Sequence, residues 1–258
     1  MKRVKFYFTS NNKLENEDLI PTPSKMMIPT WFKDSEDFID GENLTMNILD
    51  KEKRHAATKH CFPFFDTLSS GYFILLWQDI EIVRNDSTIV EFRKVKKDSN
   101  GLWVEDFSQE TGISERLGDL GHTMPRPAGY SYNHMVWKQP WSYKLPKGWS
   151  MLMTHPLNRW DLPFITASGI VDGDKFNGPG NVPFFIKEGW TGVLEKGTPI
   201  IHLIPIKRKS WMANYSSNMP KKDQKIMNSL REPPGMGYYR KYLWSKKEYD
   251  FKKRSEDK

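Results

Sequence analysis

The residues best suited to chemistry lie between His155 and Asp174. Asp172 and Asp174 are separated only by Gly173, so on a strand they would share one face. On a turn, both carboxylates could reach a metal ion or the backbone amides of the turn itself. These residue types predict catalytic positions at Asp172, Asp174 and His155, with Asp172 as a general base or metal ligand.

The loop that follows His155 offers groups for binding a ligand. Asn158 and Arg159 lie close together there, and a guanidinium can hold a phosphate or carboxylate through two parallel hydrogen bonds. Both clusters also have a structural alternative, which we favour. The aspartates can satisfy their own turn, and Arg159 can pair with Asp161 or Asp172 to hold two loops together.

Metal and thiol chemistry find less support in the sequence. His155, His202 and an aspartate would form a set that suits non-haem iron. However, no His-x-Asp motif or other metal-ligand spacing is present, so the sequence predicts no metal site and leaves the cofactor unknown. Cys61 has no paired base in view and is expected to behave as a small hydrophobic residue.

Residues 145–208 must position these side chains, and their pattern is that of a β protein. Short apolar segments alternate with turn signals such as Pro-Lys-Gly, Asp-Gly-Asp and Lys-Gly-Thr-Pro about every ten residues. We expect four strands in this block. The predicted fold is therefore mainly β, a jelly-roll or β-clip-like barrel or sandwich. The 10 Trp and 15 Phe residues could supply its core.

The rest of the chain predicts three segments. Residues 1–59 would hold a strand over 4–10, an extended arm over 21–32 that its three prolines keep from being helical, and a short helix over 50–60. Residues 60–211 would form the β body, with an apolar strand over 72–77 that follows a loop. Residues 212–258 would form a basic tail with helices over 220–231 and 238–253.

The charge of the chain is concentrated at its C-terminal end. The formal net charge is +7, and residues 207–258 carry 15 Lys and Arg against 6 Asp and Glu. Aromatic rings among basic residues are a nucleic-acid-binding pattern, while a tail docked by its aromatic face is the structural alternative. The predicted nucleic-acid-binding positions are Arg240, Lys241, Trp244, Lys246 and Lys247.

Composition also limits the cellular setting. A single cysteine excludes a disulfide framework within the chain and fits a reducing compartment. The N-terminal residues lack the apolar core of a signal peptide, and no apolar run is long enough to span a membrane. We expect a cytoplasmic protein without membrane contact, with association to a virion as an alternative.

Four short motifs resemble those of a bacterial and phage protein family of unknown function. That family shares a Pro-Gly-Trp strand, a Pro-x-Asn-Arg loop, a Gly-Val-Val-x-x-Asp turn and a Lys-Gly-x-Pro hairpin. The matching residues are Pro146–Trp149, Pro156–Arg159, Gly169–Asp174 and Lys196–Pro199. The resemblance covers about a quarter of the chain and implies a phage association but no activity.

The sequence also resembles, more distantly, the β-clip fold of deoxyuridine triphosphatases and deoxycytidine triphosphate deaminases. Three motifs carry this resemblance: Ser70–Tyr72, Gly169–Asp174 and Glu195–Ile200. It implies that Asp172 would order an attacking water and that Phe176 lies where an aromatic ring stacks on deoxyribose. Asn158, Arg159, Phe176 and His202 together form the predicted ligand-binding set.

Several residues depart from that pattern. Phe73 stands where an aspartate is expected, and His202 stands where a glutamine is expected. The loop from His155 to Arg159 replaces an Arg-Ser pair that grips phosphate. The glycine-rich C-terminal arm has only a weak counterpart in residues 231–238.

The sequence favours a non-catalytic binding or assembly module that contacts its partners through the N-terminal arm and the basic tail. We expect self-association or a phage or host protein partner. One alternative is an enzyme acting on a nucleotide or other small phosphorylated ligand between the 155–159 loop and the 172–176 turn. Another is nucleic-acid binding through the tail. The enzyme hypothesis requires the candidate residues to surround one open pocket.

Overall fold

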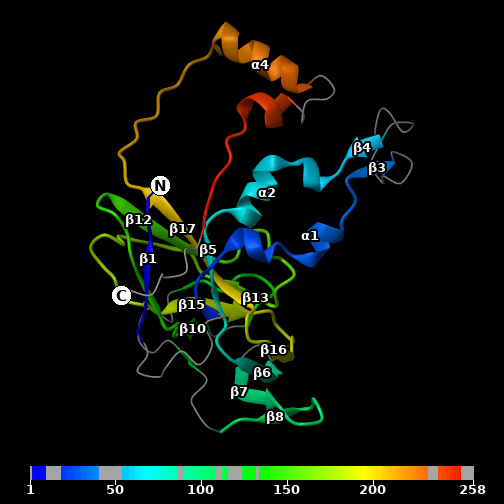
Figure 1. The fold of residues 1–258 in the computed structure, drawn as a ribbon, viewed down its shortest axis with the longest axis vertical. Helices are drawn as coiled ribbons and strands as arrows, with labels where there is room; N and C mark the ends of the chain where they lie inside the picture. The colour runs from blue at the N-terminus through cyan, green and yellow to red at the C-terminus, as the bar shows by residue number, and fades with distance from the viewer. Residues whose placement is uncertain are drawn as a thin grey trace, which may run out of the picture. The chain divides into compact units, whose positions relative to one another are not determined.

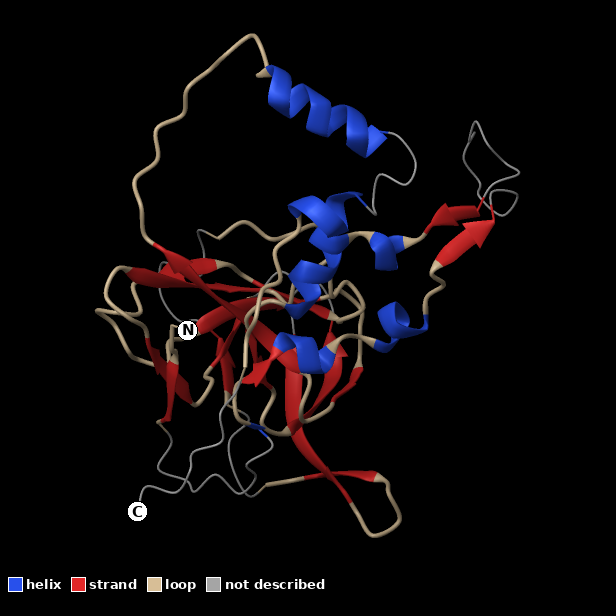
Figure 2. Cartoon of the chain, turned by 45° about the horizontal axis from the view of Figure 1, so that its top comes forward, coloured by secondary structure: helices blue, strands red, loops and turns tan. Residues whose placement is uncertain are grey.

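The protein is mainly β, with several antiparallel sheets and few helices (Figures 1 and 2). The computed structural model describes residues 2–9, 19–40, 54–85, 90–107, 112–115, 124–131, 134–231 and 238–250. The predicted fold class is confirmed. In these described ranges no sheet closes into a barrel.

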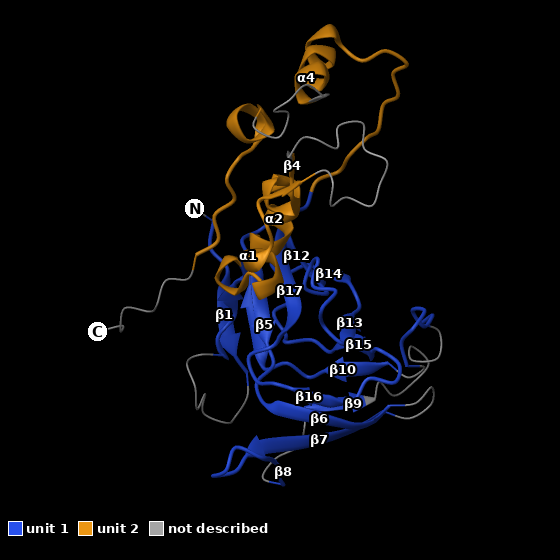
Figure 3. Ribbon diagram, turned by 90° about the vertical axis from the view of Figure 1, so that its right-hand side faces the viewer, with its two compact units in different colours: residues 1–24, 71–208, 251–258 blue, residues 25–70, 209–250 orange. Residues whose placement is uncertain are grey.

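The chain divides into two compact units (Figure 3). Unit 1 comprises Met1–Ser24, Gly71–Arg208 and Phe251–Lys258, and unit 2 comprises Lys25–Ser70 and Lys209–Asp250. The predicted segments 1–59, 60–211 and 212–258 are a different division. Unit 1 takes in the N-terminal strand, and unit 2 joins residues from both sides of the β body.

The largest sheet of unit 1 has five antiparallel strands in the order β14-β12-β17-β5-β2. Strand β17 lies at its centre and pairs with β12 on one side and β5 on the other. The isoleucines of β17 favour a strand that packs on both faces. β14 is an end strand, which pairs with β12 alone among the described strands. The strands are β14 (Gly169–Val171), β12 (Trp149–Thr154), β17 (Pro199–Lys207), β5 (Tyr72–Leu75) and β2 (Thr22–Pro23).

Two four-stranded sheets and one strand pair complete unit 1, in the orders β13-β15-β10-β9, β16-β6-β7-β8 and β1-β11. The predicted N-terminal strand is confirmed as β1, and residues 145–208 contain six strands where we expected four. The strands are β13 (Phe164–Thr166), β15 (Val182–Ile186), β10 (Met135–Trp137), β9 (Ile113–Glu115), β16 (Gly192–Leu194), β6 (Asp79–Asn85), β7 (Val90–Lys97), β8 (Trp103–Glu105), β1 (Lys5–Phe8) and β11 (Trp141–Lys144).

Aromatic side chains form the centre of the core in the β13-β15-β10-β9 sheet. Trp137 and Phe184 are fully buried, and their rings stack with centroids 3.5 Å apart and planes 8° apart. Phe164 meets the Trp137 ring edge-on at 5.4 Å. Such ring pairs bury a large apolar area each, so this cluster should contribute much of the stability of unit 1.

Unit 2 contains the helices and a small strand pair. Its elements are η2 (Ser24–Met27, which starts on the last residue of unit 1), α1 (Thr30–Asp34), β3 (Phe38–Asp40), β4 (Arg54–Ala56), η4 (Thr58–His60), α2 (Phe62–Ser69), α4 (Lys221–Arg231) and the π-helical turn η5 (Tyr239–Leu243). The helix predicted over 220–231 is confirmed as α4.

Three local predictions in unit 2 are wrong. The segment 21–32 is not wholly extended, because η2 lies between Pro23 and Pro29 and α1 begins directly after Pro29. Where a helix was predicted over 50–60, residues 54–56 pair with β3 and only 58–60 are helical, as η4, while 50–53 lie outside the described residues. Residues 62–69, predicted as a loop, form α2 with Pro63 in its first turn, where a missing N–H is harmless.

The second predicted tail helix is confirmed only in part. One turn forms at η5, and the chain is not helical from Trp244 to Asp250. Residues 251–253 of that prediction lie outside the described residues. The side chains of this segment have partners on α2, which are described below.

Candidate functional site

His155 fixes the loop that follows β12 through both of its ring nitrogens. The backbone N–H of Thr166 donates to Nδ1 at 3.3 Å, and Nε2 lies 3.1 Å from the carbonyl oxygen of Arg159. Nδ1 therefore carries no proton, and Nε2–H donates to the carbonyl. Burial lowers the pKa of His155 below its ordinary value of 6.5, which keeps the ring neutral.

His202 holds the same loop from β17 and is fully buried. The backbone N–H of Leu157 donates to its Nδ1 at 3.3 Å, so Nε2–H donates to Ser24 Oγ at 3.1 Å. The ring also packs on Phe73, with centroids 4.7 Å apart. Phe73, which replaces an expected aspartate, thus has a packing role here.

Arg159 is paired within its own loop. Nε and Nη2 donate to the carboxylate of Asp161 at 2.9 and 2.8 Å, and the Arg159 side chain is only 12% exposed. Asn158, directly before it, has φ 58°, in the left-handed region that asparagine tolerates. The guanidinium is therefore occupied by an internal carboxylate. Trp160, between the two paired residues, is 76% exposed.

Asp172 and Asp174 converge on a residue that the sequence analysis did not single out, Arg208. Its Nη1 lies 2.8 Å from Asp172 Oδ1 and 2.8 Å from Asp174 Oδ1, and Nη2 also pairs with Asp174. Ser150 Oγ donates to Asp172 Oδ1 at 2.8 Å, and Gly148 N–H donates to Asp174 Oδ2 at 2.7 Å. We call Asp172, Asp174 and Arg208 the carboxylate clamp.

The clamp holds both aspartates ionised. Hydrogen bonds from Ser150 and then Arg208 lower the pKa of Asp172, and those from Arg208 and Gly148 lower the pKa of Asp174. The pKa of Arg208 is raised in turn, chiefly by Asp174. A general base with a depressed pKa is a weak base, so this arrangement favours a structural role for the pair.

The two groups of candidate residues lie at opposite ends of β12. The clamp contacts Ser150 near the start of the strand, whereas His155 follows Thr154 at its end. Four residues lie between Ser150 and His155, so the two are about 17 Å apart along the strand. The arrangement does not support one site shared by Asp172 and Arg159. Phe176, in the turn after β14, is 53% exposed.

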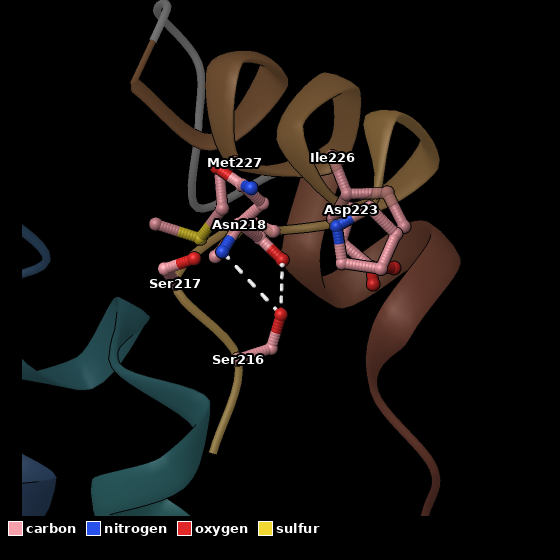
Figure 4. A pocket seen from close by; sticks show the side chains of 8 residues that line it. Ser216, Ser217, Asn218, Asp223, Ile226 and Met227 are labelled. Carbon is pink, nitrogen blue, oxygen red and sulfur yellow. Dashed lines mark hydrogen bonds between the residues drawn. The ribbon is translucent and has the colours of Figure 1, made fainter.

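A cavity of about 690 Å³ lies elsewhere, in unit 2 (Figure 4). It is open and mainly apolar, and Asn218 N–H donates to Ser216 Oγ at its rim. Its lining residues are Ser216, Ser217, Asn218, Met219, Pro220, Asp223, Ile226 and Met227. None of the predicted site residues lines this cavity.

The predicted nucleic-acid-binding residues mostly contact their own unit. Trp244 Nε1 donates to the Asp66 carboxylate at 3.0 Å, Lys247 pairs with the same carboxylate, and the Trp244 ring packs on Phe62 at 5.1 Å. The remaining three have neighbours close by: Arg240 over the Phe62 ring, Lys241 over the Tyr242 ring and Lys246 beside Glu248. Trp244 and Lys247 thus attach the tail to α2.

Among the residues that the structure describes, no group of three or more His, Cys, Asp or Glu side chains is placed to hold a metal ion. In the same residues no helix has the length and apolar character needed to cross a bilayer.

The sequence analysis also missed an exposed apolar segment after the clamp. Residues 209–215 form neither helix nor strand. We call this segment the arm from here on; it is not the N-terminal arm predicted over 21–32. Trp211 is 89% exposed, Met212 88% and Tyr215 93%. The signal was present in the sequence, since two aromatic residues and a methionine stand in an otherwise polar stretch.

Comparison with known proteins gives little further identification. No family model matches the sequence, and no curated protein matches it. Among solved structures, the chain is similar to a native dUTPase of EIAV, with a TM-score of 0.31 and 10% sequence identity, over 59% of this chain and 88% of that chain. Membership in either family that the sequence resembles stays a prediction.

Proposed function

We propose that this protein is a non-catalytic assembly module that associates with another copy of itself through the arm. The exposure of the arm carries the proposal. Three large apolar side chains within five residues are each about nine-tenths exposed. Scattered apolar residues are ordinary on a protein surface, but a concentrated apolar segment of this kind marks an interaction site.

The candidate catalytic groups all make contacts within the chain, which supports the same proposal. Arg159 is bound to Asp161, the two aspartates are bound to Arg208, and both histidines are bound to loop backbone or to Ser24. An enzyme acting on a phosphorylated ligand would need several of these groups to be released together. No observation favours that alternative, and nucleic-acid binding by the tail stays a prediction.

The two sequence resemblances imply different kinds of partner. The resemblance to the phage family implies a phage or host protein, and the β-clip resemblance implies a nucleotide-binding ancestry. A self-associating module fits the resemblance to the phage family. We propose self-association because the arm and its acceptor can both be supplied by this chain, as argued in the next subsection.

Sedimentation velocity over a concentration series tests the proposal. We expect the full chain to change from monomer to dimer as its concentration rises. The variant Trp211→Ser/Tyr215→Ser should remain a monomer, because it lacks the apolar contact. The matched control Leu102→Ser/Phe107→Ser changes two other exposed apolar residues, 65% and 84% exposed, and should still dimerise. A full chain that stays monomeric at all concentrations contradicts the proposal.

A further inference from the structure

We propose that the arm of one chain binds as an added strand along the free edge of β14 in a second copy, and that the second copy returns the same contact. This inference rests on the proposed function and names the surface that accepts the arm. It joins two features of the chain: an apolar segment that pairs with no strand in the described part of the chain, and a sheet edge with exposed apolar side chains.

The acceptor is the outer edge of β14. Its only neighbour in the described part of the sheet is β12, with Ile170 opposite Leu152. An end strand offers backbone N–H and C=O groups to an incoming chain. Ile170 is 64% exposed and Phe176 is 53% exposed. Phe176 lies in the turn directly after the strand, where its N–H donates to the Asp172 carbonyl at 2.9 Å. This edge therefore combines backbone hydrogen-bonding groups with an apolar surface.

The arm is suited to become the added strand. No backbone hydrogen bond joins residues 209–215 to any part of the chain that the structure describes. In an extended chain, alternate side chains share a face, so Trp211, Ala213 and Tyr215 would lie on one side. One face of the added strand would then be apolar, and its aromatic rings could cover Ile170 and Phe176.

The carboxylate clamp places the start of the arm near the C-terminal end of β14, with β12 between β14 and the strand that the arm follows. Arg208 immediately precedes the arm, Asp172 immediately follows β14, and their side chains are 2.8 Å apart. Seven extended residues reach roughly 23 Å. If a two-fold axis passes near the C-terminal end of β14, each arm starts close to that axis and its reach is enough to meet the outer edge of β14 in the other copy.

The area of the contact favours a second copy over an unrelated protein. Large side chains such as Trp and Tyr bury roughly 150–250 Å² each, so one arm with its acceptor surface would bury about 1,000 Å² in total. Two reciprocal arms would bury about 2,000 Å², within the range of a stable interface, whereas a single arm would be at its lower limit. Exchange between identical chains also closes as a two-fold dimer.

Mixing two defective variants tests the inference. The arm variant Trp211→Ser/Tyr215→Ser can accept an arm but cannot donate one. The edge variant Ile170→Lys can donate an arm but cannot accept one, because a lysine on an edge strand opposes pairing. Leu102→Lys serves as the control, since Leu102 is 65% exposed, like Ile170, but lies in the turn between β7 and β8.

We expect each defective variant alone to sediment as a monomer and their equimolar mixture to form a heterodimer through the one intact junction. The heterodimer should be weaker than the dimer of the full chain, and the control should dimerise like the full chain. Far-UV circular dichroism of both variants should match the full chain, since all three positions are exposed. Their melting temperatures should match it at a concentration where the full chain is a monomer, because dimerisation itself raises the melting temperature.

The possible failures separate the two proposals. If Ile170→Lys dimerises normally while the arm variant does not, self-association through the arm holds and β14 is not the acceptor. If the mixture fails to form a heterodimer, reciprocal exchange is overturned. If the full chain is monomeric, both proposals fall. Hydrogen exchange gives a second readout, because the amides of β14 should be protected in the dimer and unprotected in the arm variant.

Discussion

His155 and His202 both act as neutral connectors between strands and the loop after β12. Each accepts a backbone N–H at Nδ1 and donates from Nε2, one to a carbonyl and the other to a hydroxyl. Protonation would add a hydrogen to Nδ1 where a backbone N–H already points. Their roles therefore depend on the uncharged form, which suits structure better than proton transfer.

This dependence predicts a loss of stability in mild acid. Because the folded pKa of His155 is lowered, its unfolded form binds a proton first. Its contribution is complete above about pH 6.5 and decreases as the pH falls toward the lower folded pKa. His155→Gln should therefore flatten the dependence of the urea midpoint on pH between 7 and 5. An unchanged slope in the variant would contradict this assignment, and NMR titration of the ring supplies an independent check.

The carboxylate clamp responds in a lower pH range. The pKa values of Asp172 and Asp174 are below the ordinary 3.8, so their contribution is present above that pH and is lost as the pH falls further. Arg208→Met should be less stable than the full chain at pH 7, and the two stability curves should converge below pH 4. Arg93→Met, which removes an exposed pair with Glu91, should change stability little at either pH. Parallel curves for Arg208→Met would contradict the role of the clamp.

At the level of elements, the sheet containing β10 and β15 depends on the stacked pair Trp137 and Phe184. Phe184→Ala should destabilise the protein by about 3–5 kcal/mol, because it leaves a cavity beside a fully buried ring. Chemical denaturation measures this directly, and Phe176→Ala, at an exposed position, should cost far less. Equal effects at the two positions would mean that the stacked pair does not form the core.

The strands were the part of the fold most accessible from sequence. Apolar runs and turn signals correctly predicted β1, β5 and a series of strands over 145–208, since side-chain alternation is a local property. α2 was missed because Pro63 reads as a helix breaker, although it is tolerated in the first turn. The helix over 50–60 was wrong because residues 54–56 find a partner strand in β3, a contact that no local pattern reveals.

The site residues also show that contacts between distant parts of the chain cannot be predicted from local sequence. Their types and positions were identified, and the pairing of Arg159 with Asp161 was among the alternatives considered. Arg208 was not, because it lies 34 residues after Asp174 and meets it only through the order of strands in the sheet. The opposite ends of β12 could not be assigned to the two clusters without that order.

At the level of the whole molecule, the arm is the beginning of the second stretch of unit 2 and is the most exposed apolar segment that the structure describes. The long stretch of unit 1 ends at Arg208 in the clamp, and within unit 2 the tail is attached to α2 through Trp244 and Asp66. The arm therefore follows directly on a residue that the clamp holds, while Trp211, Met212 and Tyr215 are about nine-tenths exposed among the residues that the structure describes. Such a segment is well placed to bind a partner without unfolding either unit.

Photo-crosslinking from the arm tests self-association most directly. A photoreactive p-benzoylphenylalanine replaces Asn214 in a mixture of equal amounts of ¹⁴N- and ¹⁵N-labelled chains, and mass spectrometry identifies the joined peptides. The assembly proposal predicts crosslinked pairs that carry both isotopes, with the arm peptide of one chain joined to another chain. Crosslinks confined to a single isotope would show that the arm contacts only its own chain, and would contradict the proposal.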